Sequence, residues 1–266
     1  MEYSNSFRFK KFSVYQGNVA MKVNTDGVLL AAITAQFFKG NLLQNYLEKL
    51  PEIGNSVKNL KFKALDVGTG SGVIALILAQ KISEAIIEEN IEHLGFCIDA
   101  IDIDKECYNV ARNNFINSLW HNELTANHIS LQDFAHSQAH GSFDLIVSNP
   151  PYFSNSLKNL SDRKSVARHT IELSYTDLVV NSVHLLGDSG TLSLILPYRA
   201  KEEFLCIAHK SFLYEKELWN IFSKEGDSVP KRVIIFLSKG IQTETTIKSI
   251  GILKGGISFK TPQYKE

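Results

Sequence analysis

Short apolar runs alternate along the chain with longer segments in which apolar residues recur at helical spacing. The apolar runs predict buried strands at Lys63 to Val67, Phe96 to Asp102, Ile129 to Phe134, Phe143 to Val147 and Thr191 to Leu196. The helical pattern recurs from Val73 onwards and at Lys105 to Asn117, Tyr175 to Leu186 and Lys201 to His209. Because strands that alternate with helices pair in parallel, this order predicts an α/β fold.

The two ends of the chain predict additions to this core. Phe7 to Gln16 is typical of a hairpin, which we expect to cover the site, and Thr25 or Asp26 can cap a helix that runs through Phe38. Near the other end, Glu215 to Phe222 and Arg232 to Leu237 predict an antiparallel pair at the sheet edge, and Gly255-Gly256 marks a turn in a final strand pair.

We therefore expect a Rossmann-like, doubly wound, mostly parallel seven-stranded sheet with an antiparallel edge strand and a small N-terminal extension. The expected divisions are an N-terminal extension over residues 1–60, a core over 61–240 and a C-terminal strand extension over 241–266. A chain of 266 residues can bury one substantial core and does not require two domains.

The tetrapeptide Asn149-Pro150-Pro151-Tyr152 follows the strand that ends near Val147. Two prolines cannot continue a hydrogen-bond ladder, so the backbone leaves the sheet at this point. The Asn149 side-chain oxygen and the Pro150 carbonyl can each accept a hydrogen from a planar amino group, and Tyr152 can stack on the group's ring. This combination favours methylation of an amino nitrogen, whereas the simpler interpretation is a proline-terminated strand with a core tyrosine.

A glycine turn follows the strand that ends at Val67. Gly68, Thr69, Gly70 and Gly72 form a G-x-G-x-G pattern between that strand and a helix, and such a turn lets a ligand approach the backbone closely. Asp66 would repel a pyrophosphate and would pair with the ammonium of a methionine moiety. The pattern therefore indicates S-adenosyl-L-methionine as the ligand, the alternative being an ordinary tight strand-to-helix turn.

Two further acidic positions complete the expected cofactor site. Asp102 can accept both hydroxyls of a ribose diol, and the site includes its neighbour Ile103, whereas Asp104 is expected to cap the next helix. Asp133 could accept from an adenine amino group with Phe134 against the ring, although an ordinary polar loop is an alternative interpretation. In a sheet of strand order 3-2-1-4-5, the strands that end at Val67 and Ser148 would be neighbours, so the methyl donor and Asn149 would face each other.

With these motifs in this order, the chain resembles the class I S-adenosylmethionine-dependent N-methyltransferases that carry an Asn-Pro-Pro-Tyr motif. Within them it is similar to the bacterial tRNA(Val) adenine-N6 methyltransferases, which modify the adenine immediately 3′ of the anticodon. The matching residues are Phe9-Lys10-Lys11-Phe12, Gln16, the run from Ala20 to Leu30, Ala167-Arg168-His169 and Lys231-Arg232-Val233. The resemblance implies a tRNA substrate and catalysis by direct attack of the amine on the sulfonium methyl group.

Composition bears on the cellular compartment and on the kind of partner. The three cysteines (Cys97, Cys107 and Cys206) are an odd number, and two of them fall within strand or helix patterns, which favours reduced thiols in the cytosol. We therefore expect a cytoplasmic protein, favoured as a monomer, without a metal or a membrane segment. The net charge is zero, which does not favour a nucleic-acid partner by itself.

The distribution of charge is more informative than its sum. Residues 1–24 carry the basic residues Arg8, Lys10, Lys11 and Lys22 against a single acidic one, and residues 154–170 carry Lys158, Arg163, Lys164 and Arg168 against a single acidic one. Such segments can contact the phosphates around a flipped nucleotide, although each charge taken singly is equally typical of a solvated loop.

Two other functions fit the same motifs. A protein glutamine N5-methyltransferase presents the same kind of planar amide to a similar core. A catalytically idle nucleic-acid-binding module would keep the fold, but the intact Asn149 and glycine turn argue against it.

Overall fold

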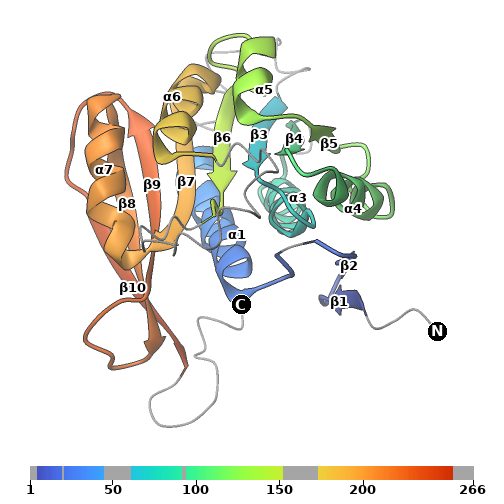
Figure 1. Cartoon of the computed structure of the whole chain (residues 1–266), viewed down its shortest axis with the longest axis horizontal. Coiled ribbons are helices and arrows are strands. Elements are labelled where there is room, and N and C mark those ends of the chain that lie inside the picture. The colour runs from blue at the N-terminus through green and yellow to red at the C-terminus, as the bar shows by residue number, and fades with distance from the viewer. Residues whose placement is uncertain (1–4, 20, 45–60, 92–93, 152–172, 254–266) are drawn as a thin grey trace, which may run out of the picture.

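In the computed structural model, residues 5–19, 21–44, 61–91, 94–151 and 173–253 are described. An eight-stranded sheet runs through the molecule in the order β10-β8-β9-β7-β6-β3-β4-β5, and a two-stranded hairpin stands beside it (Figure 1). The strands are β1 (Ser6–Arg8), β2 (Ser13–Tyr15), β3 (Lys61–Val67), β4 (Gly95–Asp102), β5 (Leu124–His128), β6 (Phe143–Ser148), β7 (Leu186–Pro197), β8 (Leu213–Lys224), β9 (Arg232–Lys239) and β10 (Thr246–Leu253).

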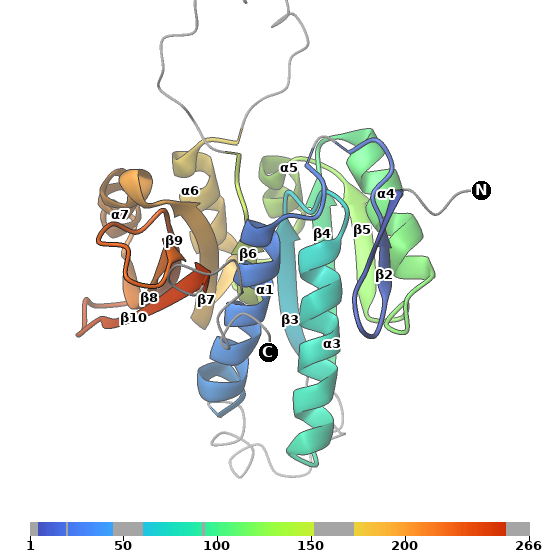
Figure 2. The same ribbon diagram turned by 90° about the horizontal axis from the view of Figure 1, so that it is seen from below.

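Helices cover both faces of the large sheet. They are α1 (Thr25–Phe37) with its π-helical continuation (Phe38–Leu42), α3 (Val73–Glu88), α4 (Lys105–Ile116), α5 (Leu131–Ser137), α6 (Tyr175–Leu185) and α7 (Lys201–Lys210). Figure 2 shows α1 and α3 side by side across one face. The expected doubly wound α/β architecture is thus confirmed.

Side-chain alternation along the central strands builds two separate cores. On β6, Leu145 and Val147 pack with α1 and α3, whereas Ile146 packs on the opposite side with α5 and α6. On β3, Ala64 packs in the core with α1 and α3, and Leu65 packs in the core with α5 and α6. Because successive side chains of a strand point to opposite faces, apolar runs of this kind require helices on both sides.

The far half of the sheet departs from the expectation in two respects. The sheet has eight strands and not seven, because β10 pairs in parallel with β8 and forms the edge. The antiparallel pair of β8 and β9 is confirmed, but β9 lies inside the sheet between β7 and β8, where it pairs antiparallel with both. Of the predicted final strand pair, the structure describes β10, and Gly255-Gly256 lies outside the described residues.

The prediction of a strand from Ile129 to Phe134 is wrong. The strand is β5, which ends at His128, and Ser130 then caps helix α5 because its hydroxyl accepts from the Asp133 N–H at 3.1 Å. Leu131, Phe134 and Ala135 are all buried, which is the spacing of one helical face. A serine followed three residues later by an acidic residue is a helix-start signal that outweighs the apolar run.

The N-terminal expectations are partly confirmed. Residues 7–16 contain the predicted hairpin, with Phe7 opposite Val14. The cap of α1 is Asn24, and neither Thr25 nor Asp26 caps it, since Asn24 Oδ1 accepts from the Gly27 N–H at 2.9 Å. Helix α3 continues through Ser83 to Glu88.

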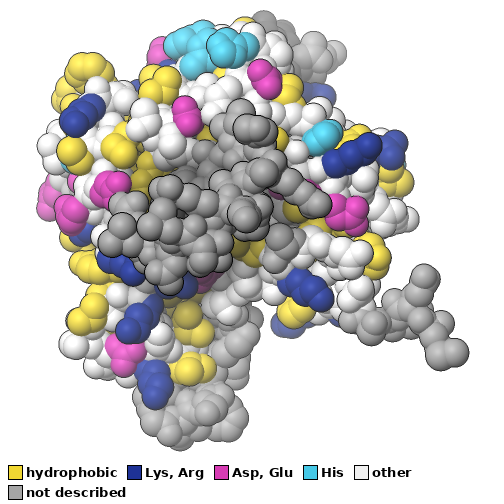
Figure 3. Space-filling model, viewed as in Figure 1, with side chains coloured by type: hydrophobic (Ala, Val, Ile, Leu, Met, Phe, Trp, Pro, Cys, Tyr) yellow, Lys and Arg dark blue, Asp and Glu magenta, His cyan; other side chains and the backbone are white. Residues whose placement is uncertain are grey.

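Surface charge is mixed on the face seen in Figure 3. Lys and Arg side chains stand in separate small groups with acidic side chains between them, and a group of histidines lies at one end. A continuous basic surface is therefore not visible on this face within the part of the chain that the structure describes.

Candidate active site

The carboxyl ends of β3 and β6 adjoin. Val67 lies opposite Ser148 in the parallel ladder, and the Ser148 hydroxyl donates to the Val67 carbonyl at 3.0 Å. The glycine turn that follows Val67 and the Asn149-Pro150 pair that follows Ser148 thus leave the sheet from neighbouring positions. This is the predicted adjacency, at the point where the chain connections diverge to the two sides of the sheet.

The three glycines of the turn serve two purposes. Gly68, Gly70 and Gly72 all have positive φ, at 72°, 57° and 80°. A Cβ added at Gly68 or Gly70 would meet open space, whereas one at Gly72 would lie 2.5 Å from Cε1 of Phe115. The first two glycines therefore leave the backbone open to a ligand, and the third lets α3 begin against α4.

Asp102 fixes the outer side of this turn. Its two carboxylate oxygens accept from the N–H groups of Gly70 and Asp104, each at 2.9 Å. Burial raises the pKa of Asp102, and these two N–H groups oppose the rise. The carboxylate is thereby held in one orientation at the end of β4, and its remaining lone pairs are those a ribose diol would use.

Asp66 lies underneath the turn. Its side chain is fully buried, Oδ2 accepts from the Thr69 hydroxyl at 2.6 Å, and Oδ1 has no hydrogen-bond partner in the described structure. Burial raises the pKa of Asp66 to about 7, against the opposing effects of the Thr69 hydroxyl and the nearby Ala75 N–H. A buried carboxylate without a full set of partners is the kind of group that a nearby cation stabilises.

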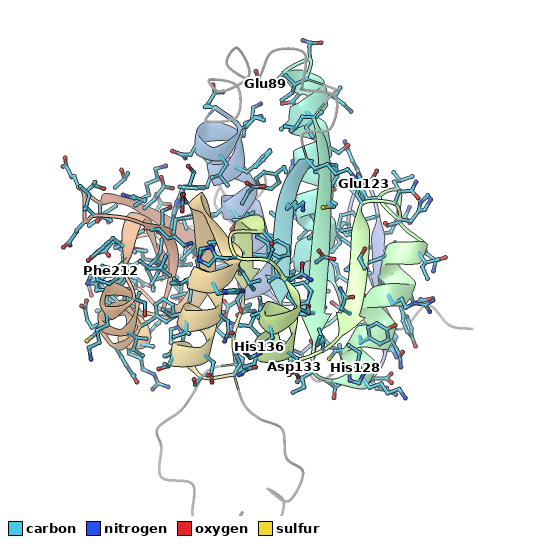
Figure 4. The ribbon with its side chains drawn as sticks, turned by 90° about the horizontal axis from the view of Figure 1, so that it is seen from above. Glu89, Glu123, His128, Asp133, His136 and Phe212 are labelled. Carbon is cyan, nitrogen blue, oxygen red and sulfur yellow. The ribbon has the colours of Figure 1, made fainter. Side chains whose placement is uncertain are left out.

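The outer wall is formed by residues after β4 and β5. Ile103 is exposed and its carbonyl oxygen lies 3.0 Å from Nε2 of His128. Asp133 is exposed at the start of α5, and Figure 4 shows it beside His128 at the edge of the sheet opposite Glu89. Ile103 and Asp133 therefore stand at the same edge as the glycine turn.

Phe134 does not join this wall. Its ring is buried in the core on the α5 side, 5.9 Å from the ring of Phe143. The predicted contact of this ring with an adenine is therefore not supported, and the reason is the helix: position 134 falls on the inward face of α5.

The acceptor side is described up to Pro151. Asn149 is half-buried, Pro150 is buried, and Nδ2 of Asn149 lies 3.8 Å from Sδ of Met21. Tyr152, Arg163, Lys164 and Arg168 lie outside the described residues.

Sequence reasoning missed Asn114, which joins three parts of the site. This buried side chain donates from Nδ2 to the carbonyls of Tyr15 and Ser71, at 2.7 and 2.8 Å, and accepts from the Tyr15 N–H at 2.9 Å. It thus connects the hairpin, the glycine turn and α4. A signal was present, because Asn114 occupies an inward position of α4 between the buried residues Ala111 and Phe115.

A cavity in the described structure lies away from the candidate site. A cavity of about 260 Å³ lies at the turn between β8 and β9, lined among others by Glu225 and Asp227, and contains none of the predicted site residues. The described residues include no group of three side chains placed to hold a metal ion, and no described helix is long and apolar enough to cross a membrane.

Comparisons with known proteins agree with this geometry. The family described as Eco57I restriction-modification methylase matches residues 80–227. A tRNA1(Val) (adenine(37)-N6)-methyltransferase of Flavobacterium psychrophilum is 32% identical over 230 residues, covering 86% of this chain and 84% of the relative. A protein of the same name from Parabacteroides distasonis is 38% identical over 232 residues, covering 87% of this chain and 83% of the relative.

Solved structures share the fold. A predicted O-methyltransferase from Agrobacterium tumefaciens superposes with a TM-score of 0.58 at 14% identity, covering 77% of this chain and 86% of that one.

Asp66 predicts a measurable dependence of stability on pH. Its folded pKa of about 7 lies above its ordinary value of 3.8, so between these pH values the native state holds a proton that the unfolded chain has released. The free energy of unfolding should therefore fall as pH rises from about 4 to about 7. Asp66→Asn should remove part of this fall. In urea titrations, the free energy of unfolding of the variant should therefore rise relative to that of the wild type as pH increases from about 4 to about 7. Asp188→Asn, at an exposed position, is the control, and equal pH slopes for Asp66→Asn and wild type would contradict the assignment.

Proposed function

The chain belongs to the family of tRNA1(Val) (adenine(37)-N6)-methyltransferases, and we propose that the glycine turn after β3 and Asn149 after β6 form the donor and acceptor sites of its reaction. The enzyme methylates the exocyclic N6 of adenine in tRNA, with S-adenosyl-L-methionine as the methyl donor. The observation that carries the assignment of the two sites is the pairing of Val67 with Ser148, because it sets the exits of both loops side by side.

The residues around the glycine turn fit this cofactor. Gly68 and Gly70 leave open space along the backbone, Asp102 presents a fixed carboxylate for the ribose, and Ile103 offers an exposed apolar side chain for the adenine. Asp66 lies beneath the turn, where the ammonium and sulfonium of the cofactor would favour its ionised form and lower its raised pKa. Asp133 remains the candidate for the adenine amino group.

The bound cofactor supplies an electrophilic methyl carbon on a sulfonium. The adenine N6 is a poor nucleophile because its lone pair is conjugated with the ring. Asn149 Oδ1 and the Pro150 carbonyl are each able to accept one N6 hydrogen, which pyramidalises the nitrogen and directs its lone pair to the methyl carbon. The cofactor held at the glycine turn would give up its methyl group to N6 and leave as the neutral thioether, and N6 would release its proton to solvent once the new bond has formed. The rate of this step depends on the orientation of the two reactants and on the exclusion of water, so no general base is needed.

The candidate contacts with the RNA phosphates are basic residues. Lys10 and Lys22 are exposed on the N-terminal segment, whereas Lys11 is engaged, with Nζ 2.6 Å from Glu84 Oε1. Burial disfavours the Glu84 carboxylate, but hydrogen bonds from Lys11, Gln80 and Lys81 outweigh it and hold the pKa of Glu84 at about 2. Lys11 is therefore the weakest of the predicted phosphate contacts, and Arg163, Lys164 and Arg168 remain sequence-based candidates.

The same proposal includes a monomer working in the cytoplasm, where tRNA is found. Cys97, Cys107 and Cys206 are free thiols, which suits a reducing compartment.

One experiment separates this function from the two alternatives. The protein is incubated with methyl-labelled cofactor and either unmodified tRNA or a release-factor protein, and nucleosides and peptides are then analysed by mass. Label in N6-methyladenosine is expected. Label on the protein alone would favour the glutamine N5 reaction, and cofactor binding without transfer to either would favour the idle module.

Asn149→Ala should nearly abolish methyl transfer and leave cofactor affinity nearly unchanged. Loss of one preorganised acceptor should cost about 3 kcal/mol of transition-state stabilisation, or roughly a hundredfold in kcat. Single-turnover rates and calorimetry with the cofactor measure the two effects. Asn117→Ala is the control, since that amide bonds only within its own helix turn among the described contacts. A rate within about threefold of wild type would contradict the role.

Asp102→Ala should weaken cofactor binding by about 2–3 kcal/mol, because it removes two hydrogen bonds to a charged group. Asp99→Ala on the same strand is the matched control, since Asp99 also has a pKa raised by burial but does not reach the glycine turn in any described contact. Calorimetry that gives both variants the wild-type affinity would move the ribose site elsewhere.

Lys10→Ala with Lys22→Ala should weaken tRNA binding and flatten the slope of log affinity against log salt by roughly 1.5 to 2 units, since each phosphate contact releases about one counterion. Arg163→Ala with Lys164→Ala should do the same. The control pair is Lys61→Ala with Lys210→Ala, which removes two exposed charges at the opposite edge of the sheet. If all three pairs leave the slope unchanged, the basic segments are merely solvated.

A further inference from the structure

We propose that Met21 is a positioning residue of the methyl transfer: its thioether orients the Asn149 amide, and its methyl group packs against the adenine ring. The proposal rests on the proposed function of Asn149. It starts from the contact in which Nδ2 of Asn149 lies 3.8 Å from Sδ of Met21, between residues 128 positions apart in the chain.

The segment that carries Met21, between Gln16 and Val23, packs against α4 at its N-terminal end. Val19 is buried against Cys107 and Val110, and Gly17 has a φ of 47°. A Cβ at Gly17 would lie 2.7 Å from Cγ2 of Val110, so the backbone approaches α4 as closely as glycine allows. Just before it, Asn114 binds both backbone groups of Tyr15.

At its C-terminal end the segment continues into α1, which is bound to β9. The side-chain oxygen of Gln16 accepts from the Val23 N–H at 2.8 Å and closes the segment into a loop. Asn24 then caps α1, and two residues later Asp26 Oδ2 accepts from Arg232 Nε at 2.8 Å. Both ends of the loop are therefore anchored to different parts of the sheet's carboxyl edge, and Met21 lies between the anchors.

The contact favours one orientation of the Asn149 amide. An asparagine amide has a donor end and an acceptor end, and a thioether can only accept. With Nδ2 facing Met21, Oδ1 faces away from the sulfur and is the end that can accept the N6 hydrogen. If the amide were rotated, Asn149 would offer N–H groups to an amino group that already donates, and the proposed activation would be lost.

Met21 is also placed to meet the base. Its side chain is 45% exposed although the loop around it is anchored, so an apolar group stands open next to the acceptor residue. Thioethers make favourable contacts with aromatic rings and adapt to their shape. A flat heteroaromatic ring whose amino group reaches Asn149 would cover this surface.

The kinetic test compares two substitutions. Met21→Leu keeps the volume and loses the sulfur, and Met21→Ala loses both. We expect kcat to fall by about tenfold in Met21→Leu and further in Met21→Ala, while the cofactor dissociation constant and the melting temperature stay at wild-type values. Val19→Ala is the matched control within the same loop: because Val19 is a buried anchor, it should lower the melting temperature. Wild-type kcat in Met21→Ala would overturn the proposal.

A spectroscopic test measures the wild-type protein and uses a variant only to assign its signal. The chain has two methionines, Met1 and Met21, so ¹³C-methyl methionine labelling gives at most two signals, and Met21→Leu identifies the second. The probe is an unmodified anticodon stem-loop of tRNA(Val), compared with the same RNA lacking the base at the target position. We expect the Met21 methyl signal to move upfield, by the ring current, with the intact RNA alone.

The outcomes separate this proposal from the proposed function. If the wild-type enzyme forms N6-methyladenosine but the Met21 signal responds equally to both RNAs or to neither, Met21 does not contact the base and the inference fails. If the wild-type enzyme forms no N6-methyladenosine in tRNA, the proposed function itself has failed.

Discussion

The pairing of β3 with β6 is the constraint on which the site depends. These strands are far apart in sequence, yet Ser148 bonds to the carbonyl of Val67 and sets the two loop exits at one height. Parallel strands place their carboxyl ends at the same edge, so one loop can hold a donor and the next an acceptor without any contact between the loops themselves. The two cores on the faces of the sheet hold this pair rigidly from both sides.

Buried polar side chains extend this arrangement outward. Asp66 supports the glycine turn through Thr69, Asp102 fixes it through Gly70, and Asn114 ties it to the hairpin. Each of these groups has a partner that only the folded chain supplies, and a partly satisfied polar group in a core is costly. The chemistry of the site is thus built into the packing of the fold.

The sequence predicted those parts of the molecule whose signals are local. The glycine turn, the proline-terminated strand and the Asp104 cap, whose carboxylate accepts from the Cys107 N–H, follow from residues within a few positions of one another. The failures came from competition between local signals, as at Ser130, where a helix cap overrode an apolar run. The eighth strand and the inward placement of β9 depend on pairing between distant segments, which periodicity does not encode. Asn114 and Met21 were missed because their importance lies in contacts across 43 to 128 positions.

The ion pair between Asp26 and Arg232 links residues 206 positions apart and so bears on how the molecule assembles. Chains are made from the N-terminus, and contacts of long sequence separation form late because their loop-closure entropy must be overcome first. The strands that frame the cofactor side, β3 to β6, are complete by residue 148, whereas the start of α1 gains this anchor only once β9 has been made. The side of the molecule that we propose to receive the base is therefore finished last, although its N-terminal segment leaves the ribosome before the strands of the large sheet.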